Sequence, residues 1–427
     1  MESYSSAKEY LSFLDSRSAL PEGFLAATTG IRFTPKERDT AEPLAMNLSL
    51  ILLEKDTADF AGVFTKNRFP GAPVLMGRER LGRKTIRGVL VNNKISNVCS
   101  PGGRQDAERL LSRLSMLIGT EAENLFTAST GIIGWSLPVG EMEAALPELF
   151  RKLDSRSILE VARGIMTTDS YPKVRRAAVG KGSIVGIAKG AGMMEPNMAT
   201  LLCFLCTDVE IPRADLREEL SLCVGRTLNR ISVDGDQSTS DMALLFSSGR
   251  RGPADRAEFR NSLMDVLSGL AADIVRNGEG AGHVIRVRVK GGKDEQTAAA
   301  IGKAVLNSPL VKTAIFGNDP NVGRIVSALG DYLGNAGVPL DTATAVIRMG
   351  GTEIFSRGAF RLDTAKETAL SKYLREAGFD PKTRGFPQND KTVEIEIDFD
   401  GSAHGAVETL GTDLSYEYIR ENADYRS

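Results

Sequence analysis

Apolar positions along the chain predict most of its strands. Segments 283–290 (HVIRVRVK) and 392–400 (TVEIEIDFD) alternate apolar and polar residues, which indicates strands with one buried face. Segments 86–93 (IRGVLVNN) and 242–248 (MALLFSS) are almost continuously apolar, which is typical of strands buried on both faces. A further apolar run, 200–206 (TLLCFLC), predicts another buried strand with a threonine at its start.

Four segments have the period of amphipathic helices, and several end at a glycine, as helix C-termini commonly do. They are residues 103–119, 212–231, 255–278 and 365–378. Because strand and helix patterns alternate along the chain, we expect sheets covered by helices in a layered α+β fold. The polar, glycine-rich segment 290–296 predicts a boundary between a larger domain, 1–292, and a smaller α/β domain, 293–427.

Composition narrows the classes of partner. The chain of 427 residues has 53 Lys and Arg against 55 Asp and Glu, a formal charge of -2. The chain therefore lacks the excess of basic residues that binding to nucleic acid or to a membrane surface requires. No apolar run approaches the roughly 20 residues of a membrane span, and the first residues do not resemble a secretory signal. We therefore expect a cytoplasmic protein that binds neither nucleic acid nor membrane.

The few cysteines and histidines restrict the chemistry. Cys203 and Cys206 have C-x-x-C spacing, but in a strand they point to opposite faces, and no second such pair completes a zinc site. We interpret them as buried, inert thiols. His283 and His404 are the only histidines, and we interpret both as incidental, although a Ser-His-Asp or Cys-His mechanism would need one of them. We expect no metal and no cofactor.

Thr200 offers a nucleophile that needs no histidine. A threonine hydroxyl can be activated by the α-amino group of its own residue once the preceding peptide bond has been cut. The α-amine, with a pKa of about 7.7 to 8.0, can accept the hydroxyl proton near neutral pH. In the uncut chain, the same hydroxyl could attack the carbonyl carbon of Ala199. From the residues alone, however, an ordinary threonine at a strand entrance is the commoner interpretation.

Eight segments, spread in order over nearly the whole chain, carry a family resemblance. They are 61–74 (AGVFTKNRFPGAPV), 128–138 (ASTGIIGWSLP), 165–173 (IMTTDSYPK), 186–204 (GIAKGAGMMEPNMATLLCF), 229–241 (NRISVDGDQSTSD), 277–282 (NGEGAG), 310–325 (LVKTAIFGNDPNVGRI) and 418–427 (YIRENADYRS). Together they resemble the ornithine acetyltransferase family, the glutamate N-acetyltransferases of arginine biosynthesis.

The resemblance implies a layered αββα sandwich of the N-terminal-nucleophile type with a smaller C-terminal α/β domain. It also implies self-cleavage between Ala199 and Thr200, giving an α chain (1–199) and a β chain (200–427) that stay together, commonly as α2β2. Thr200 would take an acetyl group from N-acetylornithine and pass it to glutamate by a ping-pong mechanism. Acetyl-CoA stays open as a second possible donor.

The resemblance also assigns the residues that would act on the reacting carbonyl. Thr130 and Gly131 would form the oxyanion hole, whose donors stabilise the negative charge of a tetrahedral intermediate. Lys189 would bind the carboxylate of the amino-acid substrate, which needs a cation.

Further substrate contacts are implied at the remaining matched segments. Thr167 or Thr168 would correspond to a substrate-binding threonine, and the match does not decide between them. Glu279 would hold the ammonium end of the substrate. Asn422 and Ser427 match the family's closing residues, which return to the pocket.

The chain also departs from the family pattern. The departures are Gly282, His283, Val322, Glu421 and the segment 91–97 (VNNKISN), which carries Lys94. We interpret them as changes of substrate shape, so an acyltransferase with a different amino-acid acceptor stays open. An N-terminal-threonine amidohydrolase or aminopeptidase, with water as acceptor, stays open as well, and so does an uncleaved binding protein.

Overall fold

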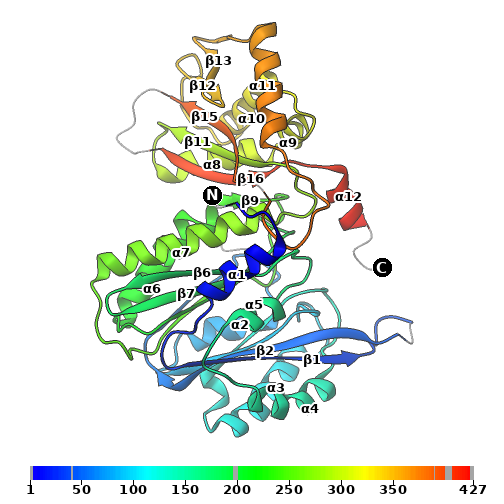
Figure 1. Ribbon diagram of the computed structural model, residues 1–427, viewed down its shortest axis with the longest axis vertical. Helices are drawn as coiled ribbons and strands as arrows, with labels where there is room; N and C mark the ends of the chain where they lie inside the picture. Colours follow the sequence, from blue (N-terminus) through cyan, green and yellow to red (C-terminus); the bar gives the residue numbers. More distant parts are fainter. Residues whose placement is uncertain (1–2, 40–41, 196–200, 389, 400–405, 424–427) are drawn as a thin grey trace.

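The computed structural model describes residues 3–39, 42–195, 201–388, 390–399 and 406–423. In this part of the chain the strands form three sheets. The first two sheets are stacked on one another between helices, and the third lies at the other end of the long axis (Figure 1).

The first sheet is built from the N-terminal part of the chain. In spatial order its strands are β1 (Phe24–Phe33), β2 (Leu44–Thr57), β4 (Ile86–Asn92) and β5 (Leu125–Ser129). Neighbouring strands are antiparallel except β4 and β5, which are parallel. Helices α3 (Gly103–Ile118) and α4 (Val139–Arg151) cover its outer face with apolar residues such as Leu114 and Leu146. Helix α2 (Ala72–Arg80) packs at the β5 edge.

The second sheet combines strands from both sides of the expected cleavage site. In spatial order they are β3 (Phe60–Phe64), β10 (Met242–Ser247), β8 (Leu202–Thr207), β7 (Gly182–Lys189) and β6 (Lys173–Val179). Strands β8 and β10 are buried along their whole length, as their continuous apolar sequences predicted. Helices α6 (Arg213–Arg226) and α7 (Arg256–Arg276) cover the outer face of this sheet.

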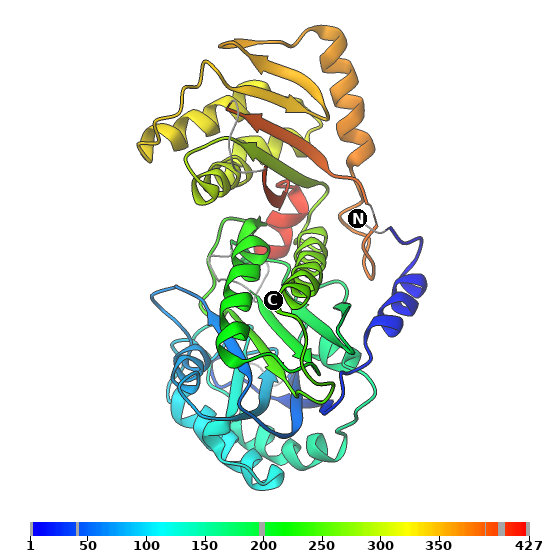
Figure 2. The ribbon, with the colours of Figure 1, turned by 90° about the vertical axis from the view of Figure 1, so that its left-hand side faces the viewer.

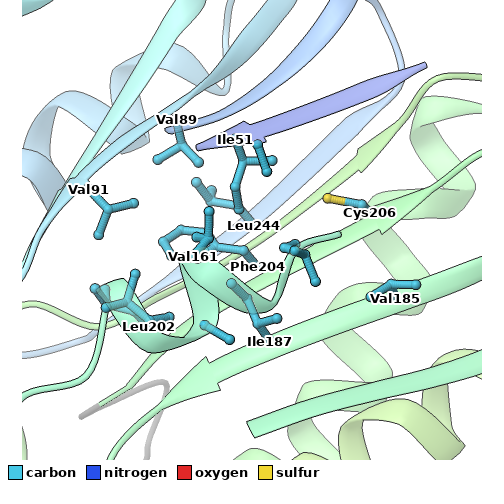
Figure 3. Packing of buried hydrophobic residues seen from close by; sticks show 14 of the residues in the cluster. Ile51, Val89, Val91, Val161, Val185, Ile187, Leu202, Phe204, Cys206 and Leu244 are labelled. Carbon is cyan, nitrogen blue, oxygen red and sulfur yellow. The ribbon is translucent and has the colours of Figure 1, made fainter. Parts of the chain in front are cut away.

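The two stacked sheets share an apolar core. Figure 3 shows Leu202, Phe204 and Cys206 of β8 within this core, together with Val89 and Val91 of β4. The short helix α5 (Leu159–Gly164) also contributes to it, and helix α1 (Ala7–Arg17) packs against β6. Two layers of sheet between two layers of helix confirm the layered α+β fold.

The two thiols of β8 lie as the sequence predicted. Cys206 belongs to the core between the sheets, whereas Cys203 packs on the opposite face among residues of α6 and α7. Both are buried, and burial raises the pKa of Cys203 to about 12 and also raises the pKa of Cys206. The interpretation as buried thiols is confirmed.

The third sheet forms a separate core in the C-terminal part. Its strands, in order, are β14 (Ala359–Phe360), β13 (Thr352–Ser356), β12 (Val346–Met349), β15 (Val393–Asp398), β11 (Val284–Lys290), β16 (Val407–Thr412) and β9 (Ile231–Ser232). The helices beside it are α8 (Glu295–Asn307), α9 (Pro309–Phe316), α10 (Val322–Asn335) and α11 (Thr364–Ala377). The boundary expected after residue 292 falls in the turn that follows β11, and it stays a prediction.

One predicted helix is too long. The sequence pattern predicts a single helix over 212–231, but α6 ends at Arg226. Thr227 leaves the helical region with φ of -126° and ψ of -83°, and its hydroxyl donates to the Cys223 carbonyl at 2.7 Å. A short 3-10 turn, η2 (Leu228–Arg230), follows; another, η1 (Ala122–Asn124), precedes β5.

The remaining predicted helices and strands agree with the structure to within two residues at each end where the chain is described. Among the described residues, no helix is both long and apolar enough to cross a membrane.

The core between the sheets predicts a large cost for removing its aromatic rings. Phe204 is fully buried, so Phe204→Ala should lower the free energy of unfolding by about 3–5 kcal/mol through lost burial and a residual cavity. The midpoint of urea unfolding, followed by circular dichroism, measures this loss. The control is Phe69→Ala, because Phe69 is 71% exposed; equal losses in the two variants would contradict the assignment of the core.

Candidate active site

A cavity of about 130 Å³ brings the predicted site residues together. Its walls include the loop after β5, the end of β7, the start of β8 and helix α12 (Tyr416–Ala423). The predicted residues that line it are Thr130, Gly131, Thr167, Thr168, Lys189, Glu279 and Asn422. They come from five distant parts of the sequence, and their chemical roles stay predictions.

The remaining three predicted residues, Ala199, Thr200 and Ser427, lie outside the described residues. Leu201, which directly follows Thr200, lines the cavity, and its carbonyl accepts the N–H of Met242 at 3.1 Å. The residue expected to be the nucleophile is therefore bonded to a residue of the cavity wall.

The expected oxyanion hole lies in the loop after β5, where the backbone requires a glycine. Gly131 has φ of +124°, and a Cβ there would lie 2.2 Å from the carbonyl oxygen of Lys94. The same carbonyl accepts the N–H of Ile132 at 3.0 Å, and the N–H of Thr130 donates to the Asn92 carbonyl at 3.1 Å. These bonds hold Thr130 and Gly131 against the end of β4.

Glu279 connects the cavity with the C-terminal helix. Its Oε2 accepts a hydrogen bond from the Asn422 side chain at 2.9 Å, and Glu279 is only 8% exposed. A Cβ on Gly192 would lie 2.2 Å from Glu279 Oε2, so a glycine there leaves room for the carboxylate. Figure 2 shows α12 between the stacked sheets and the third sheet. The end of the described chain thus returns to the pocket through Asn422.

Helix α12 is also tied to the loop that carries Glu279. The hydroxyl of Ser415 accepts the N–H groups of Glu417 and Tyr418, both at 3.1 Å, and donates to the Gly280 carbonyl. Gly280 has φ of +62°, and a Cβ there would lie 2.1 Å from the Tyr418 nitrogen. Only a glycine allows the loop and the helix to approach so closely.

Asp169 joins two segments of the cavity wall. Its Oδ2 accepts the N–H of Thr167 at 3.1 Å, and its Oδ1 accepts the N–H of Gly190 at 2.8 Å. Gly190 directly follows Lys189, the last residue of β7. One buried carboxylate therefore fixes the backbone beside two of the predicted substrate contacts, Thr167 and Lys189.

A buried lysine links this carboxylate to a third segment. Lys173 Nζ donates to Asp169 Oδ1 at 2.6 Å and to Asn277 Oδ1 at 2.7 Å, and both ion-pair side chains are fully buried. Asn277 stands two residues before Glu279. The pair thus connects the three segments that carry Thr167, Lys189 and Glu279.

Burial and charge oppose each other at this pair. Burial raises the pKa of Asp169, but the Lys173 and Lys189 ammonium groups and the hydrogen bonds outweigh it and lower the pKa to about 2. Burial lowers the pKa of Lys173, while Asp169 acts in the opposite direction. Sequence analysis missed both residues, although they lie in the segment IMTTDSYPK, because nothing in that segment points to Asn277.

Asp241 is a second residue of the cavity that sequence analysis missed. It ends the polar segment 234–241, and it is 2% exposed. Its Oδ2 has no hydrogen-bond partner among the described residues. Burial raises the pKa of this carboxyl well above its usual range, although the backbone of Leu201 and the charge of Lys189 act in the opposite direction.

Three of the sequence departures lie away from the cavity. His283 is buried, with Nδ1 2.7 Å from Asp413 Oδ2 and Nε2 3.1 Å from the Leu374 carbonyl oxygen. Gly282 donates its N–H to Asp413, and Val322 packs in the third core. None of these three residues lines the cavity, and their interpretation as changes of substrate shape stays a prediction.

The second histidine of the chain, His404, lies outside the described residues. Among the residues that the structure describes, no cluster of three His, Cys, Asp or Glu side chains could hold a metal ion.

A cavity with a few buried polar and charged groups in its wall is typical of a site that binds small molecules. The model of the ArgJ family matches residues 31–427. The arginine biosynthesis bifunctional protein ArgJ of Nitratidesulfovibrio vulgaris is 38% identical over 422 residues, covering 96% of this chain and 100% of the relative. Glutamate N-acetyltransferase Oat2 of Streptomyces clavuligerus is 35% identical over 415 residues, covering 96% and 99%.

Among solved structures, the arginine biosynthesis bifunctional protein argJ of Bacillus halodurans has 33% identity and a TM-score of 0.45, over 52% of this chain and 97% of that chain. From the family match and the two relatives, the chain belongs to the ArgJ family, and it is an acyltransferase of amino-acid biosynthesis. The family resemblance found in the sequence is thereby confirmed.

The buried pair predicts that Asp169 affects substrate binding as well as stability. Asp169→Asn leaves the Lys173 ammonium without a counter-charge, so unfolding free energy should fall by about 3–5 kcal/mol. Because the segments of Thr167 and Lys189 lose their shared acceptor, KM should rise at least about tenfold in steady-state assays. The control is Asp273→Asn. Asp273 is also a buried carboxylate, it forms an ion pair with Arg175 at 2.6 Å, and it does not line the cavity. A similar rise in KM for Asp273→Asn would contradict the positioning role of Asp169.

The raised pKa of Asp241 predicts a pH-dependent cost. A carboxyl with a folded pKa above its unfolded pKa favours folding below the unfolded value, about 3.9, and loses that contribution as pH rises through the folded value. Asp241→Asn should therefore be more stable than the wild type at pH 8, by at least about 1 kcal/mol, with a smaller difference at pH 5. Unfolding midpoints of the wild type and the variant at both pH values test this prediction. If Asp241→Asn were less stable than the wild type at both pH values, the Asp241 carboxylate would be stabilising and the prediction would be wrong.

Proposed function

We propose that this acyltransferase moves an acetyl group from N2-acetyl-L-ornithine to L-glutamate through an acetyl-Thr200 intermediate. The observation that carries the proposal is the single cavity lined by Thr130, Gly131, Lys189 and Glu279 together with Leu201, the neighbour of Thr200. The names of the relatives from Nitratidesulfovibrio vulgaris and Streptomyces clavuligerus support it.

Self-cleavage would create the nucleophile. The Thr200 hydroxyl attacks the Ala199 carbonyl carbon, the peptide C–N bond breaks, and an ester joins the Ala199 acyl group to the Thr200 oxygen. Water then hydrolyses the ester, which leaves a carboxylate on Ala199 and a free α-amine on Thr200. Pairing of β7 with β8, including Lys189 opposite Leu202, would keep the α chain (1–199) and the β chain (200–427) together.

The first half-reaction would acylate Thr200. Its α-amine accepts the hydroxyl proton while the oxygen attacks the acetyl carbonyl of N-acetylornithine. Donors at Thr130 and Gly131 stabilise the oxyanion of the tetrahedral intermediate. The intermediate collapses, the C–N bond to ornithine breaks, and the ornithine nitrogen leaves with the proton held by the α-ammonium group.

The second half-reaction would transfer the acetyl group. The α-amine of glutamate attacks the ester carbonyl of acetyl-Thr200 and gives a proton to the α-amine of Thr200. The C–O bond breaks, the threonine oxygen takes that proton back, and N-acetylglutamate leaves. No cofactor is needed, and acetyl-CoA could replace N-acetylornithine in the first half-reaction.

The substrate contacts follow from charge. Lys189 would pair with the substrate carboxylate, and Glu279 would hold the ammonium group. Hydroxyl donors at Thr167 or Thr168 and the polar ends of Asn422 and Ser427 would complete the contacts. We place the enzyme in the cytoplasm as an α2β2 assembly of processed chains.

Loss of the Thr200 hydroxyl should abolish both cleavage and transfer. Thr200→Ala should run as one full-length band on a denaturing gel, whereas the wild type should give two bands, the larger of which (residues 200–427) should begin with the sequence Thr-Leu-Leu. Transfer by the variant should fall by at least about 10⁴-fold, because removing a catalytic nucleophile leaves only binding and oxyanion stabilisation. Acetyl transfer by an uncut or hydroxyl-free protein would refute the mechanism.

The acceptor is tested in the same preparation. Rapid ornithine release from N-acetylornithine should require glutamate, and initial rates at varied substrate concentrations should give the parallel lines of a ping-pong mechanism. Release at the same rate without glutamate would make the protein an amidohydrolase instead.

A further inference from the structure

A second cavity adjoins the first and is larger, at about 390 Å³. The two cavities share Gly131, Thr167, Thr168 and Glu279 in their walls. Pockets that enclose small ligands usually measure about 300–1,000 Å³. The first cavity, at about 130 Å³, lies below that range, so an N-acylated amino acid whose carbonyl lies at Gly131 must extend into the second.

The second cavity carries charges of both signs. Lys94, Arg384 and Glu421 line it beyond the shared residues. Arg384 and Glu421 form an ion pair with each other, and their side chains are 52% and 25% exposed. Among the described residues, no acidic side chain forms an ion pair with Lys94, which is half-buried.

Backbone contacts fix these groups relative to the predicted oxyanion hole. The Lys94 carbonyl accepts the N–H of Ile132, directly after Gly131. Glu421 precedes Asn422 in α12, and Asn422 is bonded to Glu279. Lys94 and Glu421 are the two departures of the sequence that line a cavity. Lys94 lies in the loop after β4 and Glu421 in helix α12, and both line the second cavity.

We propose that this second cavity binds the side-chain end of both substrates, with Glu421 joining Glu279 in pairing with the ammonium group of the basic donor, and Lys94 and Arg384 pairing with the acidic acceptor. The inference rests on the proposed function, in which one acyl-enzyme meets an amino acid that ends in an ammonium group and then one that ends in a carboxylate. An exposed ion pair such as Arg384–Glu421 contributes about 0–1 kcal/mol. A substrate group can therefore displace either partner at little cost.

The physical requirement is specific to a ping-pong enzyme. In the two half-reactions the α-nitrogen of each amino acid lies at the same acetyl carbonyl carbon, so their side chains should lie in the same direction. A cavity with one sign of charge would bind one substrate well and repel the other. The Arg384–Glu421 ion pair can open so that Glu421 pairs with the basic substrate or Arg384 with the acidic one, and Lys94 is an additional cation for the acidic substrate.

The test is a comparison of two single variants of the processed enzyme. Glu421→Gln should raise KM for N-acetylornithine about five- to tenfold and leave KM for glutamate within about twofold, because a charged hydrogen bond is lost for the basic side chain only. Lys94→Gln should give the reverse. N-acetylnorvaline, which has no terminal amine, should be a poor donor with equal KM in the wild type and Glu421→Gln.

Glu79→Gln is the matched control, since Glu79 pairs with Arg104 on an exposed surface outside both cavities. Its KM values should equal those of the wild type. Variants that change both KM values by the same factor, or neither, would overturn the inference while leaving the proposed function intact. A wild-type enzyme that does not transfer acetyl between these substrates would overturn the proposed function and the inference with it. Melting temperatures equal to the wild type confirm that each variant is folded.

Discussion

The ion pair between Asp169 and Lys173 is the interaction on which the geometry of the cavity depends. Two fully buried charges are tolerated only when each is paired and hydrogen-bonded. Asp169 meets that requirement with backbone N–H groups of Thr167 and Gly190, and Lys173 meets it with Asn277. The need to satisfy the charges therefore links three segments of the cavity wall, namely the turn at Thr167, the end of β7 and the end of α7.

The stacked sheets provide the rigid base for these loops. Strands β5, β7 and β8 end or begin at the cavity, so Thr130, Lys189 and Leu201 stand next to backbone that is held in a sheet. Glycine matters at two close approaches: Gly131 against the Lys94 carbonyl and Gly280 against α12. Apolar packing thus holds the sheets together, while a few charged residues and glycines determine how closely the loops around the cavity approach one another.

The periodicity of the sequence predicted the layered fold and most element bounds because burial patterns are local. It overextended α6, since the break at Thr227 depends on that residue's own backbone and hydroxyl bond. The candidate site came from the family resemblance, as Thr200 alone looks like a common strand residue. Asp169 and Lys173 were missed because their significance depends on a partner far away in the sequence; Lys173 and Asn277 are 104 positions apart.

The strand order of the second sheet has a consequence for a chain cut before Thr200. Strands β8 and β10 from the later part lie between β3 on one side and β7 and β6 on the other, all from the earlier part. After cutting, the two pieces would share one sheet without a covalent link, and refolding would become a bimolecular search that depends on protein concentration. Such a molecule folds once as a single chain and afterwards survives by unfolding slowly.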